Sequence, residues 1–273
     1  MNTDLTFLTK EDIASKAPLV LAKEPTREVS DRYTFASTET VVDDLAELGW
    51  FVTDASQRKS RGKNTEFSPH MVKFGNPDLR ITGSEGDVSF PQIVLRNNHD
   101  GRGSLKFMAG LFRLVCSNGL IIASAKFGEL SIKHKGYSFD EMRKLVTERT
   151  EAIPEQIDIM NDMKARMLTR QEQEYLALEA LSIRANVPPE NLDDFKGKID
   201  KLTLEDILTP ERSADRGTDL WNTYQVTQEK MIRGGFHMQM GIDAKVRKVK
   251  EIKSFEKDLE LNKKLFTVAK EML

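Results

Sequence analysis

The segment between Gln92 and Tyr137 constrains the fold more than any other, because short apolar runs alternate in it with signals for tight turns. One run ends at Asn97 and leads into Asn98-His99-Asp100-Gly101, and an Asp-Gly pair between two apolar runs is a strong hairpin signal. A second signal, Asn118-Gly119, suits a tight turn because both residues tolerate positive φ. The segment therefore predicts strands joined by tight turns.

The run from Ser104 to Cys116 inside this segment is compatible with two structures. Its apolar residues between Leu105 and Val115 recur at helical spacing, whereas the flanking turn signals favour a strand. The sequence leaves both open. Further along, Leu130 to His134 alternates with a period of two, which predicts a half-buried strand.

Most of the remaining pattern is helical. Ser138 and Thr169 are suitable N-caps, Pro154 predicts a break, and glycine at Gly49 and at Gly234-Gly235 predicts helix ends. The predicted helices run from Thr38 to Leu48, within Phe139 to Ala185, from Trp221 to Ile232 and from Ser254 to Met272.

These patterns predict an α+β fold, in which a strongly twisted antiparallel sheet packs with helices and is followed by a helical C-terminal half. We predict three parts: an N-terminal arm at residues 1–33, a β-rich core domain at 34–137, and a helical region at 138–273 that packs on the core. The arm contains Pro18 and Pro25, lacks sustained periodicity and can dock through residues 19–21.

Charge is distributed unevenly along a chain whose net charge is only −2. Residues 51–136 carry 13 Lys and Arg against 7 Asp and Glu, which makes the β-rich middle a candidate anion-binding face. The single cysteine excludes an internal disulfide and fits a reducing cytosol. No apolar run reaches the roughly 18 residues of a membrane span. We therefore expect a cytoplasmic protein without a membrane partner.

Three blocks of sequence carry a resemblance to a known family: Asn98 to Gly101 together with Phe112 to Leu120, Asp219 to Glu229 with Arg233-Gly234-Gly235, and Leu261-Asn262. They resemble the phage/plasmid-like protein family, which is catalogued as a domain of unknown function, over roughly Thr34 to the C-terminus. Members are commonly found in prophages, phages and plasmids, so the resemblance implies a gene of a mobile element in a bacterial host. Gln57 and Arg61 look like a pair of residues common in that family.

Signatures of enzymatic chemistry are missing from the sequence. It has no Walker-type phosphate loop, dinucleotide-binding glycine motif, zinc-protease motif or nucleophile-elbow motif. His70, His99, His134 and Cys116 are irregularly spaced, which does not favour a metal site. Cys116 ends an apolar run, which is more typical of a buried small residue than of a nucleophile. We predict no catalytic residue, metal or cofactor, and favour a binding protein over an enzyme.

The basic middle predicts a nucleic-acid-binding protein, with single-stranded DNA as the preferred partner, because aromatic residues lie among its cations: Phe107, Phe112, Phe127 and Tyr137. Strands followed by a long helix also look like the core of phage single-strand annealing proteins, an analogy of fold that implies an annealing homo-oligomer in phage-type recombination. The expected contacts, lining one groove bounded by His99, are Arg58, Arg61, Arg96, His99, Arg102, Lys106, Arg113, Lys133, Lys135, Arg233, Arg247 and Lys248.

Alternatives remain open at two motifs and for the function. Asn98-His99-Asp100 is either a self-capped turn or a loop whose His99 reaches a ligand. The polar helix from Trp221 to Glu229 either forms a buried network that docks the helices on the sheet or lines a groove. The alternative function is a phage or plasmid interaction protein that acts against host defence or restriction.

Overall fold

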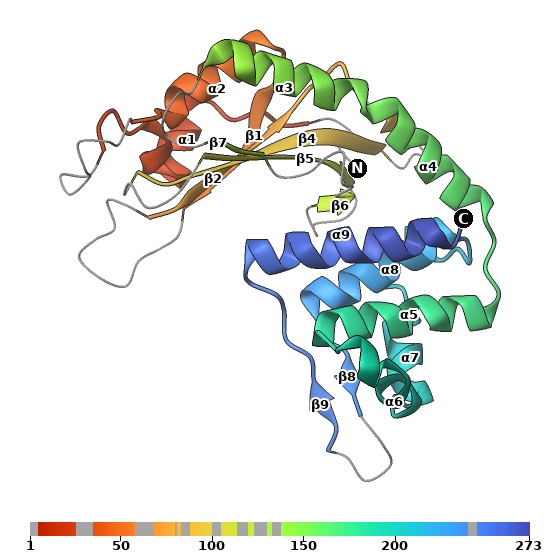
Figure 1. The fold of residues 1–273 in the computed structure, drawn as a ribbon. Helices are drawn as coiled ribbons and strands as arrows, with labels where there is room; N and C mark the ends of the chain where they lie inside the picture. The colour runs from red at the N-terminus through yellow and green to blue at the C-terminus, as the bar shows by residue number, and fades with distance from the viewer. Residues whose placement is uncertain are drawn as a thin grey trace. The chain divides into compact units, whose positions relative to one another are not determined.

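The computed structural model describes residues 5–25, 35–57, 68–79, 81–82, 88–99, 105–113, 120–122, 130–132, 138–239 and 245–273 (Figure 1). The chain divides into two units. The first unit comprises residues 1–115 and 126–153, and the second comprises residues 116–125 and 154–273.

An antiparallel sheet forms the centre of the first unit. Its main strands follow the order β1-β2-β4-β5, while β3 pairs with β4 and β7 with β5. Because Arg96 stands opposite Lys106, β4 and β5 form the predicted hairpin, and Ser104 to Cys116 contributes a strand rather than a helix. The strands are β1 (Phe51–Gln57), β2 (His70–Gly75), β3 (Ile81–Thr82), β4 (Val88–Asn97), β5 (Leu105–Arg113) and β7 (Leu130–Ile132).

Helices cover one face of this sheet: α1 (Lys10–Lys16), the 3-10 helix η1 (Pro18–Leu21), α2 (Thr38–Glu47) and α3 (Phe139–Glu151) (Figure 1). Side chains alternate along a strand, so Ile93 and Leu95 of β4 point into the core beneath the helices, whereas Arg96 lies on the opposite face. Leu95 is fully buried, and burial of a leucine side chain contributes about 2 kcal/mol.

The N-terminal segment contains a helix that sequence periodicity did not reveal. Thr9 and Asp12 form a capping box at the start of α1, and Ile13, Ala17 and Val20 are buried in the core. A helix of seven residues is too short to be stable alone, so packing against the sheet must stabilise it. The predicted docking through residues 19–21 is confirmed at Val20.

The helix boundaries predicted from the sequence lie close to the boundaries in the structure. Ser37 caps α2, and Gly49 takes a positive φ of 80° just after it. The Ser138 hydroxyl accepts a hydrogen bond from the amide of Glu141 at the start of α3. The predicted turn at Asn118-Gly119 and the predicted buried position of Cys116 lie outside the described residues.

The second unit is mainly helical, which confirms the α+β class. Its helix α8 contacts α5, α7 and α9, and the short strand β6 packs against α9. Thr169 forms a capping box with Glu172 at the start of α5, as predicted. Among the described residues, no helix has the length and apolar character needed to cross a membrane. The elements are β6 (Leu120–Ile122), α4 (Ile153–Ala165), α5 (Arg170–Ala185), η5 (Pro189–Asn191), α6 (Leu192–Gly197), α7 (Lys201–Leu208), η6 (Ser213–Asp215), α8 (Leu220–Arg233), β8 (His237–Met238), β9 (Arg247–Lys248) and α9 (Phe255–Glu271).

Candidate nucleic-acid interface

Half of the predicted contact residues have side chains that the structure does not describe. Arg113 lies in β5, but nothing is described of its side chain. The residues outside the described ranges are Arg58, Arg61, Arg102, Lys133 and Lys135.

Two predicted cations lie together on the sheet of the first unit. Arg96 and Lys106 occupy opposite positions on β4 and β5, so both half-buried side chains lie on the face away from the helices. The register also places Lys73 of β2 on that face, 3.8 Å from the carboxylate of Asp54. Three cations therefore share this side of the sheet.

A second set of cations forms an exposed strip in the second unit, which we call the basic segment (residues 245–253). It carries five basic residues against one acidic residue, Glu251. Arg247 and Lys248 form β9, which pairs with β8, and both side chains are exposed. In the part of the chain that the structure describes, no carboxylate forms an ion pair with the five cations: Lys245, Arg247, Lys248, Lys250 and Lys253.

Gly234 and Gly235 determine how the chain leaves α8 and returns to the basic segment. Both have positive φ, 66° and 86°, which favours glycine. A Cβ atom at Gly234 would lie only 2.4 Å from the carbonyl oxygen of Val249. The amide of Gly235 donates to that same oxygen at 2.8 Å, and the amide of Val249 donates to Phe236 at 2.9 Å. The predicted helix stop therefore also allows the basic segment to pass close to the end of α8.

Arg184 of α5 fixes the basic segment from the other side. Its guanidinium donates hydrogen bonds to the carbonyl oxygens of Met231 in α8 and Lys250 in the basic segment. Half-burial lowers the pKa of this guanidinium, which nonetheless remains charged at neutral pH because arginine starts so high. One side chain thus ties together α5, α8 and the basic segment.

Charged residues near the C-terminal end of α8 form ion pairs with one another and with neighbouring segments. Glu229 pairs with Arg212 and, at 3.1 Å, with Arg233. Lys230 lies 2.6 Å from the carboxylate of Glu211, and this ion pair lowers the pKa of Glu211. The buried side-chain polar atoms of Trp221 and Gln225 have no hydrogen-bond partner among the described residues, so both alternatives for Trp221 to Glu229 stay predictions. The predicted contact Arg233 has a carboxylate partner inside the protein.

His99 requires a correction, because it is buried and does not border a groove. Only 2% of its surface is exposed, and its Nε2 lies 3.2 Å from the carbonyl oxygen of Leu19. The Gln57 side chain accepts a hydrogen bond from the amide of Leu19 at 3.2 Å. Both peptide groups of Leu19 are therefore held by side chains of the first unit, and the role of His99 is to fasten the N-terminal segment.

Buried polar side chains linked by hydrogen bonds lie next to the contact between His99 and Leu19. Two of them, Thr38 and Asn97, were not among the residues predicted from the sequence. Asn97 donates to the hydroxyl of Thr38 at 2.9 Å, and that hydroxyl lies 2.8 Å from Nε2 of His70. The Thr38 hydroxyl can donate its proton to Nε2 of His70 in the ring tautomer that leaves this nitrogen unprotonated. Burial, with a smaller effect from neighbouring His99, lowers the pKa of His70 to about 3. His70 is therefore neutral at physiological pH.

The structure leaves one spatial expectation untested. Arg96 and Lys106 belong to the first unit, whereas Arg247 and Lys248 belong to the second, so a common groove stays a prediction. Within the described ranges, no group of three or more His, Cys, Asp or Glu residues is arranged to hold a metal ion.

Comparison with known proteins places the chain in a family. A family model described as a domain of unknown function (DUF932) matches residues 25–266. The chain belongs to the DUF932 family. It is also similar to two proteins of Escherichia coli (strain K12), the UPF0380 proteins YfjQ and YafZ. Each is 30% identical over 272 residues, which cover 97% of this chain and 92% of the relative. No solved structure matches the chain. The DUF932 match includes His99, α8 and the basic segment, but not Leu19.

Proposed function

We propose that this DUF932 protein binds single-stranded DNA in the cytoplasm of a bacterial host, as a protein of a phage, prophage or plasmid. The observation that carries the proposal is the basic segment, whose five cations are exposed and, among the described residues, lack ion pairs. Cations placed in this way can neutralise phosphates and release counterions, which is the main source of affinity for nucleic acid.

The composition of the basic segment favours contact with the sugar-phosphate backbone. Between its cations it contains only Val246, Val249, Glu251 and Ile252, so it offers no aromatic side chain on which a base could stack. A strand held only by its phosphates keeps its base edges free to pair. This supports annealing of complementary strands as the activity, and a homo-oligomer would extend the path along which one strand is held.

The sheet cations of the first unit provide a second basic surface, on which each cation also has an interaction partner within the protein. Arg96 and Lys106 are directly opposite each other, where strand geometry spaces side chains about 5 Å apart, and Lys73, opposite Val94, shares their face. We propose that this face contacts the same nucleic acid as the basic segment.

A salt titration tests the proposal. The five cations of the basic segment contribute about −3.5 to the log-log slope for a single strand, which alone lowers affinity roughly 100-fold when salt rises fourfold. The double variant Arg247→Ala/Lys248→Ala should make the slope less steep by about 1.4, which lowers the part due to the basic segment from roughly 100-fold to roughly 20-fold. Fluorescence anisotropy with a labelled oligonucleotide of about 30 nucleotides measures both values.

A matched control removes two exposed lysines elsewhere in the second unit. Lys198→Ala/Lys201→Ala changes the net charge by the same amount and should leave the slope unchanged, because these residues lie outside the basic segment. Equal slopes for wild type and the Arg247/Lys248 variant would contradict the assignment. If no oligonucleotide, single or double stranded, binds at low salt, the alternative becomes the better account: a phage or plasmid protein that interacts with host defence or restriction proteins.

A further inference from the structure

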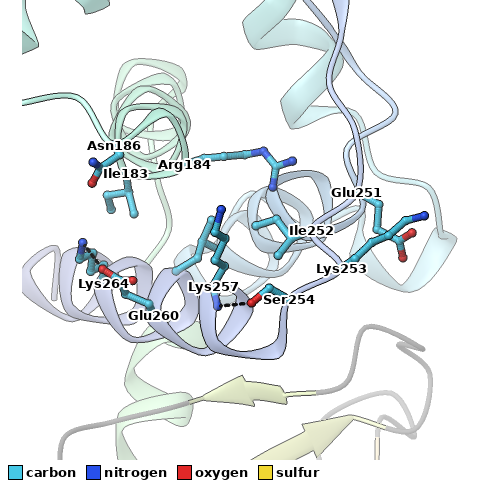
Figure 2. A pocket seen from close by; sticks show the side chains of 11 residues that line it. Ile183, Arg184, Asn186, Glu251, Ile252, Lys253, Ser254, Lys257, Glu260 and Lys264 are labelled. Carbon is cyan, nitrogen blue, oxygen red and sulfur yellow. Dashed lines mark hydrogen bonds and ion pairs between the residues drawn. The ribbon is translucent and has the colours of Figure 1, made fainter. Parts of the chain in front are cut away.

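A pocket of about 720 Å³ lies within the second unit, where the basic segment enters α9 (Figure 2). Its walls are the C-terminal turn of α5 with Asn186, residues 251–254, and the first turns of α9. The Ser254 hydroxyl caps α9 by accepting a hydrogen bond from the amide of Lys257. Volumes of about 300–1,000 Å³ are typical of sites for small ligands, so this pocket is large enough for a nucleotide.

The charged lining of the pocket is positive after internal pairing. Glu260 and Lys264 form an ion pair at 2.7 Å, which lowers the pKa of Glu260 and leaves this pair neutral overall. Arg184, Lys253 and Lys257 then face a single remaining acid, Glu251. Neither lysine forms an ion pair with any residue that the structure describes. Figure 2 shows Lys253 extending away from Arg184 and Lys257, so the concave wall presents the Lys257 ammonium group and the Arg184 guanidinium to an anion.

The donors are arranged from two directions. Figure 2 shows the Lys257 side chain extending from α9 toward α5, on the side where Arg184 lies. Arg184 is held in place by the carbonyl oxygens of Met231 and Lys250, so its position is fixed before any ligand arrives. A guanidinium has five N–H donors, of which two are used in this way, and about three remain for an anion.

Aliphatic side chains complete the lining. Ile183 of α5, Ile252 of the basic segment and Leu261 of α9 supply apolar surface beside the cations. This combination suits a ligand with one anionic group and one flat or apolar group, and a phosphate ester of a nucleoside has both. Inorganic phosphate would use the cations but not the aliphatic wall.

From these observations we infer that the pocket binds a nucleoside phosphate, with its phosphate at Lys257 and Arg184 and its base against the three aliphatic side chains. Two sources supply that chemistry: a free mononucleotide, or the phosphorylated end of a strand held by the basic segment. The second source rests on the proposed function, whereas the first does not.

Titration calorimetry with AMP and with inorganic phosphate tests the pocket directly. AMP should bind more tightly than inorganic phosphate, and Lys257→Met should weaken AMP at least about tenfold, because a hydrogen bond to a charged group is lost. Lys270→Met, which removes an exposed lysine from the same helix outside the pocket, should leave AMP affinity unchanged. Equal affinities for AMP and phosphate, or no binding of either at millimolar concentration, would overturn the inference.

Oligonucleotides with a 5′-phosphate or a 5′-hydroxyl separate the two sources. If the pocket takes the end of a strand, the phosphorylated oligonucleotide binds more tightly and displaces AMP, and Lys257→Met removes the difference. If it takes a free nucleotide, both oligonucleotides bind equally and AMP binding persists. The Arg247→Ala/Lys248→Ala variant should retain AMP binding, so failure of the basic segment and failure of the pocket can be told apart.

Discussion

His70 should make the first unit lose stability in mildly acidic solution. Its pKa is about 3 in the folded protein, against an ordinary value of 6.5. Below pH 6.5 the unfolded chain binds a proton that the folded chain excludes, so the free energy of unfolding falls with pH until the folded pKa is reached. Between pH 7.5 and pH 5.0, this linkage amounts to about 2 kcal/mol.

The two tryptophans allow this loss to be assigned to one unit. Trp50 is buried in the first unit and Trp221 in the second, so a Trp221→Phe background leaves a single fluorescent reporter for the sheet. Urea unfolding at pH 7.5 and pH 5.0, followed by Trp50 emission, gives the difference in unfolding free energy. In this background His70→Gln should reduce the pH-dependent loss by about 2 kcal/mol.

His237 provides the matched control, because its side chain is 61% exposed and lies in the second unit. His237→Gln should retain the full pH dependence of the Trp50 transition. The reasoning is wrong if the unfolding free energy of the protein with His70 falls by less than about 0.5 kcal/mol between pH 7.5 and pH 5.0. It is also wrong if the unfolding free energy of the His70→Gln variant falls by as much as that of the protein with His70.

Two further substitutions test the second unit. Gly234→Ala should lower the unfolding free energy by about 1–3 kcal/mol, because φ of 66° is strained for alanine and the new methyl group would contact the Val249 carbonyl. If the urea midpoint of the variant, measured by Trp221 emission, equals that of the unmutated protein, residue 234 and the Val249 carbonyl are not this close. Arg212→Ala should lower the unfolding free energy by about 3 kcal/mol, because the buried carboxylates of Asp215 and Glu229 each lose an ion-pair partner. Lys198→Ala breaks only the exposed ion pair with Asp194 and should change the unfolding free energy by less than about 0.5 kcal/mol.

The elements that could be predicted from sequence are those whose signals are local. The hairpin through Asn98, the caps at Ser138 and Thr169 and the stop at Gly234 depend on residues close together in the chain. Helical spacing between Leu105 and Val115 was misleading on its own, because β5 is paired on both sides and tertiary pairing overrides local periodicity.

The site could be predicted only in part, because burial and pairing depend on contacts between distant residues. Arg247 and Lys248 are exposed as expected. His99 is buried instead, where its ring lies beside the carbonyl oxygen of Leu19, 80 positions earlier in the chain. One feature of the pocket can be recognised in the sequence: Lys253 and Lys257 lie on either side of the Ser254 cap. Its remaining cation, Arg184, comes from α5 and has no local signal in the sequence.

The docking of α1 has a practical consequence for anyone who shortens this protein. The match to the family begins at residue 25, which would suggest a natural place to cut. However, Leu8 donates its amide to the carbonyl of Val52, and Ile13, Ala17 and Val20 fill the core beside β1 and α2. Cutting at residue 25 would uncover an apolar strip on the sheet and leave His99 without its carbonyl partner, and exposed strips of this kind promote aggregation. Expression of the sheet alone should therefore begin before Thr9.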